Sequence, residues 1–155
     1  MFKKVAFLAV AASALAANGA LAATATTPMN VSATITGSCT ISATALAFGT
    51  IVLTSANTDN TADLTVNCTN AVPYEITING ATGGRAMSFG INSLNYEVYT
   101  DAARTTGWSN TTGPGTVTGT GTGVDQTVTV YGRVPVQSTP PAGAYTDTRT
   151  VTVSY

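Results

Sequence analysis

The sequence contains no histidine, and its only lysines are Lys3 and Lys4, close to the N-terminus. Without histidine, the chain cannot build the Ser–His–Asp or Cys–His arrangements of common hydrolases, or a zinc site with histidine ligands. Without a lysine after Lys4, it offers no Schiff-base nucleophile and no Ser–Lys dyad. We therefore expect no catalytic residues, no metal site and no cofactor, and we predict that the protein is not an enzyme.

Charged residues are also scarce, at 8% of the sequence. Beyond the two lysines there are four arginines and seven carboxylates, a balance of 4 − 7 = −3. This composition gives no basic patch for nucleic acid or anionic lipid. A glycosidase would need two carboxylates across a cleft, but Glu75 and Glu97 occupy polar positions of predicted strands and are expected to face solvent. We expect no nucleic-acid partner and no small-molecule substrate.

Residues 1–22 have the features of a secretory signal peptide. Two lysines precede an apolar run, and the small-x-small triplet Ala20–Leu21–Ala22 closes the segment. The apolar run is too short to span a bilayer, so we predict a cleaved signal peptide and export, with cleavage after Ala22 and with Ala16 and Ala23 as alternative sites. The remaining stretch of about 133 residues suits one domain. We expect a polar leader with a first strand at 23–37, followed by a single β-domain at 38–155.

Beyond residue 22 the chain is rich in threonine, valine and glycine, and no stretch has helical periodicity. Short runs of alternating polar and apolar residues, separated by glycine-rich turns, predict an all-β protein. The predicted strands are 29–35, 39–48, 62–68, 74–78, 85–89, 95–100, 126–134 and 145–155. The expected architecture is an antiparallel β-sandwich of immunoglobulin-like type, with a closed barrel as the alternative.

Two aromatic residues have alternative interpretations. Trp108 lies in the glycine- and threonine-rich stretch 105–126, which we predict to be an exposed loop. A role in covering the end of the core is favoured for Trp108 over a role as an anchor of a contact surface. Tyr145 follows Gly143 in "GAYTD". It either forms a corner, with its ring on the core and its hydroxyl bonded to the backbone, or is an ordinary aromatic residue at a strand start.

The chain has two cysteines, Cys39 and Cys68. In an exported protein an even pair predicts one disulfide. Their spacing is far from C-x-x-C, and no histidine is present to complete a zinc site, so a redox or metal role is disfavoured. Closing a loop of about 30 residues stabilises the fold by about 3.6 kcal/mol in the chain-entropy model.

The two ends of the expected domain complement each other. In "PMNVSATITG" the apolar residues Met29, Val31, Ala33 and Ile35 alternate with polar ones, but no turn pairs this strand with a neighbour. The sequence ends in another alternating strand, 146–155, with no strand after it. An unpaired sheet edge accepts a strand from another chain. If the first strand of one copy fills the gap in the next, the head-to-tail contact does not close and a filament grows.

Several segments resemble the spore coat protein U family. They are "YEVYTDAARTTGWSN" (96–110), "VTVYGRVP" (128–135), "GAYTDTRTVTVSY" (143–155), "GSCTIS" with "FGT", and "VNCTNAVPYEI". The family includes subunits of archaic chaperone–usher pili. The resemblance implies an incomplete immunoglobulin-like sandwich that lacks its final strand. A periplasmic chaperone supplies a strand during transit to the outer-membrane usher, and the N-terminal strand of the next subunit replaces it in the fibre.

The resemblance also implies roles for individual residues. Met29, Val31, Ala33 and Ile35 match the donor-strand residues by position, and Tyr155 carries the C-terminal carboxylate that chaperones of this kind hold. The expected function is that of a structural subunit of a secreted adhesive pilus on the cell surface, which supports adhesion and biofilm formation. The alternative is a monomeric secreted binding module, or a spore or surface coat protein, on a complete β-sandwich.

Overall fold

The computed structural model describes residues 22–53 and 56–155, so the expected signal peptide lies outside the described residues except for Ala22. The described chain is all-β and antiparallel, as expected. Its strands are β1 (Cys39–Ala43), β2 (Thr58–Cys68), β3 (Pro73–Ile78), β4 (Ala86–Phe89), β5 (Asn92–Asn95), β6 (Glu97–Tyr99), β7 (Val117–Thr120), β8 (Gln126–Val134) and β9 (Val151–Ser154). In these two ranges no helix is long and apolar enough to cross a membrane.

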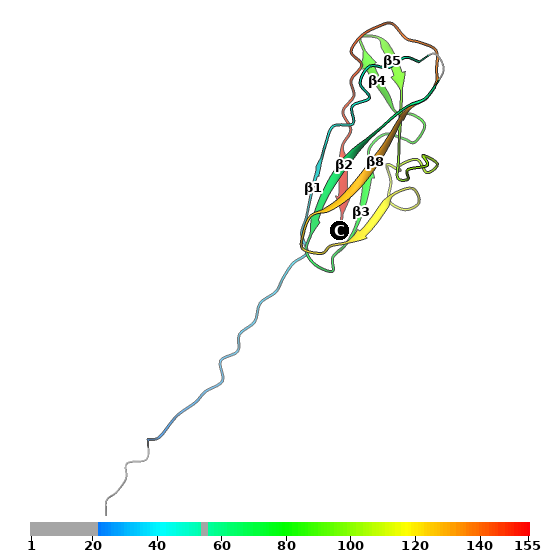
Figure 1. Ribbon diagram of the computed structural model, residues 1–155. Helices are drawn as coiled ribbons and strands as arrows, with labels where there is room; N and C mark the ends of the chain where they lie inside the picture. The colour runs from blue at the N-terminus through cyan, green and yellow to red at the C-terminus, as the bar shows by residue number, and fades with distance from the viewer. Residues whose placement is uncertain (1–21, 54–55) are drawn as a thin grey trace, which may run out of the picture. The chain divides into compact units, whose positions relative to one another are not determined.

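The chain divides into two units, of which the second, Ile35–Tyr155, contains all the strands. Its larger sheet has the order β1-β2-β8-β6, and Figure 1 labels three of these strands, β1, β2 and β8. In β2 the residues Ala62, Leu64 and Val66 are buried, whereas the intervening Asp63 is exposed. Successive side chains of a strand point to opposite faces, so the alternation in the sequence gives this sheet one face for the core and one for solvent.

The second sheet has the order β7-β3-β9, and β4 and β5 form a separate hairpin. The core lies between the two larger sheets, where Val66, Ile76 and Val134 have no exposed surface. Trp108 is also fully buried, and its Nε1–H donates to the carbonyl oxygen of Ile76 at 2.9 Å. The prediction that Trp108 covers the core is therefore confirmed. The prediction of an exposed loop at 105–126 is wrong in part, because β7 lies within it and pairs with β3.

The prediction that Glu97 faces solvent is wrong, because its side chain is buried and the residue is only 8% exposed. It accepts a hydrogen bond from the guanidinium of Arg85, which is 1% exposed, and another from the backbone N–H of Gly83. Arg85 also donates to the carbonyl oxygens of Ile78 and Trp108, at 3.0 and 2.8 Å. A buried carboxylate is tolerated when it is paired and fully hydrogen-bonded. The alternating pattern gave no sign that Arg85, which directly precedes β4, pairs with Glu97 and covers it.

The strands predicted at the two ends of the chain differ most from the observed ones. Residues 29–35 form no strand, and the last strand is limited to β9. Thr146 forms only an isolated bridge, to Ser88. A strand is defined by its ladder hydrogen bonds, so an alternating sequence without a neighbouring strand remains outside every sheet.

Candidate functional site: a groove between β1 and β9

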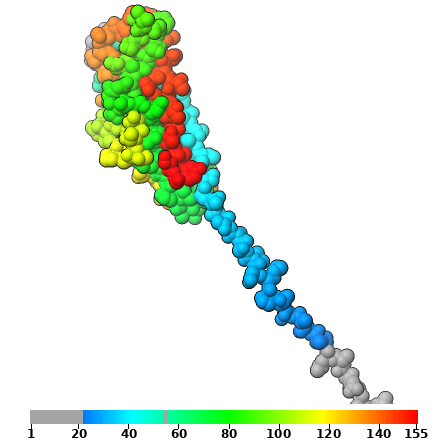
Figure 2. All heavy atoms as spheres, turned by 180° about the vertical axis from the view of Figure 1, so that it is seen from behind, coloured from blue at the N-terminus to red at the C-terminus, as the bar shows by residue number. Residues whose placement is uncertain are grey.

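One side of the sandwich ends in two edge strands. β1 is the outer strand of the larger sheet and pairs only with β2, and β9 is the outer strand of the second sheet and pairs only with β3, in the described part of the chain. The C-terminal residues and β1 lie side by side on the surface (Figure 2). No ladder joins them within residues 22–53 and 56–155. Each edge therefore presents backbone N–H and C=O groups that a further strand could use.

A groove opens between the continuations of these strands, residues 43–48 and 145–151. It has a volume of about 350 Å³ and reaches the core residues Leu64, Ile78 and Val130. A second hollow of about 610 Å³ adjoins it, lined by residues 46–51 and 139–145 among others. The two hollows share the side chains of Leu46, Phe48, Met87 and Tyr145. The sandwich is thus open to solvent along an apolar groove on this side.

A polar cluster lies within the groove. The hydroxyl of Tyr96 donates to Asp147 Oδ2 at 2.9 Å and accepts a hydrogen bond from Arg149 Nε at 3.1 Å. Arg149 also pairs with Asp147 at 2.5 Å. Burial raises the pKa of the Tyr96 phenol, so the hydroxyl keeps its proton and remains a donor near neutral pH. The sequence analysis missed this cluster, and its one available signal was the i, i+2 spacing of Asp147 and Arg149 on one strand face.

Tyr145 forms a corner where the two hollows meet. Its hydroxyl donates to the carbonyl oxygen of Pro141 at 2.8 Å, and its ring lies 5.7 Å from that of Phe89. Gly143 is required for this packing, because a Cβ at that position would collide with the Phe89 ring. Of the two interpretations of Tyr145, the corner is confirmed.

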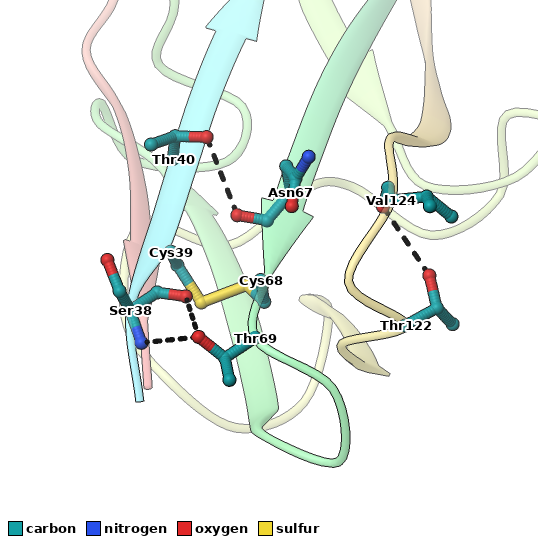
Figure 3. The surroundings of a disulfide bond; sticks show 8 residues. All are labelled: Ser38, Cys39, Thr40, Asn67, Cys68, Thr69, Thr122 and Val124. Carbon is teal, nitrogen blue, oxygen red and sulfur yellow. Dashed lines mark hydrogen bonds between the residues drawn. A yellow bond between two sulfur atoms is a disulfide. The ribbon is translucent and has the colours of Figure 1, made fainter. Parts of the chain in front are cut away.

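A disulfide joins Cys39 and Cys68 at the other end of β1 (Figure 3). The two residues are directly opposite in the β1–β2 ladder. Beside them, Ser38 N donates to the hydroxyl oxygen of Thr69 at 3.1 Å, and Thr69 N donates to the carbonyl oxygen of Ser38 at 2.9 Å. The start of β1, which follows the N-terminal segment directly, is therefore covalently anchored to β2.

The residues predicted to form the donor strand are accessible. Met29, Val31 and Ile35 are 83, 82 and 86% exposed, and Ala33 is exposed as well. Large apolar side chains at this level of exposure, repeated at every second position, leave much apolar surface in water. Tyr155, one residue after β9, is 64% exposed. No described cluster of three or more His, Cys, Asp or Glu residues could hold a metal ion.

Residues 25–152 match the family model of the Spore Coat Protein U domain. The chain belongs to the Spore Coat Protein U domain family. This chain is similar to Protein U of Myxococcus xanthus. The two are 35% identical over 173 aligned residues, which cover 97% of this chain and 96% of Protein U. The resemblance found in the sequence is thereby confirmed.

A solved structure has a similar fold. It is the CsuC–CsuE chaperone–tip adhesion subunit pre-assembly complex from archaic chaperone–usher Csu pili of Acinetobacter baumannii, and its matching chain is 21% identical with a TM-score of 0.59. The match covers 79% of this Spore Coat Protein U domain protein and 41% of the solved chain. The chain thus spans less than half the length of that relative.

Proposed function

We propose that this chain is a structural subunit of a secreted fibre of the archaic chaperone–usher type. In this proposal, residues 29–35 of one copy occupy the groove between β1 and β9 of the next copy. The observation that carries the proposal is the groove itself, whose floor is the hydrophobic core and whose two walls, residues 43–48 and 145–151, continue the edge strands β1 and β9. A soluble domain rarely leaves its core open to water, so a groove of this kind needs an occupant.

The N-terminal segment has the chemistry of that occupant. Placed as a strand, it directs Met29, Val31 and Ile35 to one face, together with Ala33. Full burial of Met, Val or Ile contributes about 1.5–3 kcal/mol each, so three of them contribute about 5–9 kcal/mol before the cost of ordering the segment. Ladder hydrogen bonds to β1 or β9 add to this. The contact is head-to-tail and does not close, so it generates a fibre.

The open groove also indicates which partner proteins the subunit would require. Before assembly the groove must be covered, which calls for a periplasmic chaperone that donates a strand, and the fibre then passes an outer-membrane usher to the cell surface. The similar solved structure is a complex of a chaperone with a tip adhesion subunit, which supports this assignment. We propose that the exposed C-terminal residue Tyr155 contacts the chaperone through its carboxylate. Such a fibre would support adhesion and biofilm formation.

The decisive experiment compares Val31→Asp with Ser32→Asp. Val31→Asp would place a carboxylate in an apolar groove, at a cost of several kcal/mol, and we expect it to abolish fibres seen by electron microscopy. Ser32→Asp adds the same charge one residue away, on the opposite face, and should leave assembly intact. Equal effects of the two substitutions would overturn the donor assignment.

A second candidate function is that of a coat protein, which the match to the family model of the Spore Coat Protein U domain supports. A coat subunit on a complete sandwich would need no donor from a second copy. Expressed without a chaperone, it would be a monodisperse, protease-resistant monomer. A donor-strand subunit expressed in the same way should aggregate, be degraded or self-assemble.

A further inference from the structure

The groove between β1 and β9 is not apolar throughout. Its lining includes three polar residues that meet beside the continuation of β9; we call this set the groove cluster, and its members are Tyr96, Asp147 and Arg149. The side chains of Asp147 and Arg149 are 20 and 25% exposed, so they are open to whatever lies in the groove. A strand placed there would therefore contact charged groups as well as the hydrophobic core.

The groove cluster is fixed in shape. Arg149 donates to the Tyr96 hydroxyl and pairs with Asp147, and its guanidinium lies 5.9 Å from the centre of the Tyr96 ring. Gly80 leaves room for it, because a Cβ at that position would lie 2.7 Å from Arg149 Nη1. Asp147 Oδ1 accepts a hydrogen bond from Thr148 N at 2.8 Å, so both carboxylate oxygens have partners. Charged groups paired in this way tolerate an apolar cover, but they cannot move aside without losing these contacts.

The wall that carries the groove cluster matches the donor segment in length. Residues 145–151 alternate: the even-numbered threonines are exposed, and four odd-numbered residues line the groove, namely Tyr145, Asp147, Arg149 and Val151. The apolar face of the donor segment also has four residues at alternate positions, namely Met29, Val31, Ala33 and Ile35. Each set spans six residue steps, which is about 20 Å in an extended strand. Full overlap of the two therefore leaves one register for each strand direction.

Of the two registers, the antiparallel one suits the side chains better. It pairs position 33 with 147 and position 31 with 149, so Val31 packs on the apolar stem of Arg149 and the methyl group of Ala33 lies beside the Asp147 carboxylate. The parallel register would place Val31 beside that carboxylate. Covering a carboxylate with a large apolar side chain costs more than covering the stem of an arginine, which favours the antiparallel register.

Ala33 is the one small residue on the apolar face of the donor segment, and this register places it beside the groove cluster. Residues directly opposite in an antiparallel pair have Cβ atoms about 4.5–5.5 Å apart. A larger side chain at position 33 would need the space that Asp147 and its partners fill, and overpacking a fixed environment is destabilising. By apolar burial alone, a larger residue would bind more tightly. Space and burial therefore predict opposite effects of enlarging Ala33.

We propose that the groove cluster selects donor strands by size, because it requires a small side chain at the third position of their apolar face. This inference rests on the donor-strand function proposed above and names the partner more closely. The occupant that fits is a second copy of this chain, which presents Ala33 at that position. A donor strand with four large apolar residues is rejected, although it offers more apolar surface.

Peptides of residues 24–36 test this selection without any change to the protein. The exported protein, unfolded in urea with its disulfide intact, is diluted into buffer with peptide, and fibre formation is followed by light scattering. A peptide that occupies the groove blocks fibre growth, and the concentration that halves growth measures its binding. We expect an Ala33→Val peptide to require about tenfold more than the unaltered peptide. An Ala33→Ser peptide, which stays small and places a hydroxyl beside Asp147, should require less than about threefold more.

An exchanged peptide with both Val31→Ala and Ala33→Val has the same composition as the unaltered one. It should block growth about tenfold less well than the Val31→Ala peptide, because it adds the clash to the lost burial. If Ala33→Val matches or improves on the unaltered peptide, if the exchange recovers the loss caused by Val31→Ala, or if Ala33→Ser is as harmful as Ala33→Val, the inference is overturned. If the unaltered peptide has no effect on growth, the donor-strand function itself fails.

Removing both charges from the protein tests the cause. The double variant Asp147→Ala, Arg149→Ala leaves no single charge behind and opens the space opposite position 33. The difference between the unaltered and Ala33→Val peptides should then shrink from about tenfold to less than about threefold, since the two changes are in contact and their effects are not additive. An undiminished difference would show that another part of the groove excludes the larger side chain. The peptide series uses the unaltered protein, so it decides the selection even if the double variant does not fold.

Discussion

The two edges of the sandwich are completed in different ways. At the edge formed by β6 and β7, residues 106–109 cross from one sheet to the other: Trp108 N donates to the Val98 carbonyl oxygen at 2.8 Å, and its indole N–H donates to Ile76. At the edge formed by β1 and β9, no ladder crosses within the described residues, and the apolar groove lies open. One edge is closed by the chain itself, and the other remains open.

Because of this difference, we expect the two edges to contribute differently to the stability of the domain and to its proposed assembly into fibres. The closed edge buries the Arg85–Glu97 pair, which connects β6, β3 and the Trp108 segment. The open edge carries Tyr145 and the partly accessible cluster of Tyr96, Asp147 and Arg149. Changes at the closed edge should lower the free energy of unfolding regardless of assembly state, whereas changes in the groove should act chiefly on assembly.

The largest expected effect is at the closed edge. Arg85→Ala leaves the Glu97 carboxylate buried without its partner, which costs about 3–5 kcal/mol. We expect loss of exported protein, or a correspondingly lower free energy of unfolding in urea. Arg133→Ala, which breaks a surface ion pair with Asp59, should cost about 1 kcal/mol or less. If the two variants were equally stable, the buried Arg85–Glu97 pair would not be a major stabilising contact of the closed edge.

The disulfide should have the next largest effect. Replacing Cys39 and Cys68 together by alanine removes a cross-link between β1 and β2 and should destabilise the domain by about 2–4 kcal/mol. Because the bond lies at the far end of β1 from the groove, the protein that does fold should still assemble into fibres of normal shape. Urea unfolding and electron microscopy of the same preparation measure the two properties. Stable protein that forms no fibres would contradict this separation.

Tyr145→Phe tests the corner at the open edge. The substitution keeps the ring against Phe89 and removes the hydrogen bond to Pro141, which should cost about 1 kcal/mol. Unfolding in urea is the measurement, and Tyr155→Phe at the exposed C-terminus is the control, with no expected change. An effect as large as that of Arg85→Ala would mean that the open edge also stabilises the domain.

The smallest expected effect is that of acid on the surface carboxylates. The hydrogen bond from Arg133 lowers the pKa of Asp59, and the backbone N–H of Thr106 lowers the pKa of Asp101. A carboxyl with a lowered folded-state pKa stabilises the fold above its unfolded pKa of about 4, and this contribution is lost as pH falls through the folded value. The free energy of unfolding should therefore decline below about pH 4, and less steeply in Asp59→Asn. An unchanged slope in that variant would exclude Asp59 as a contributor.

Strands with an apolar side facing the core were predictable from the sequence. Residues 126–134 alternate over their whole length, and β8 has the same bounds. Residues 39–48 were predicted as one strand, but only β1 pairs with β2 as a regular strand, because the chain beyond Ala43 turns to line the groove. β7 was missed because Gly119 and the surrounding threonines resemble loop residues. Gly119 is needed there, since a Cβ at that position would collide with the Tyr74 ring.

The sequence by itself determined the all-β class, the pairing of the two cysteines and the apolar parity of residues 29–35, because each depends on residue type and local spacing. Only the tertiary structure decided that Glu97 is buried with Arg85 and that Tyr96 meets Asp147 and Arg149. These contacts join residues from different strands, and their partners depend on strand order and register. Periodicity along one strand identifies its two faces but carries no information about which strand, loop or molecule will cover them.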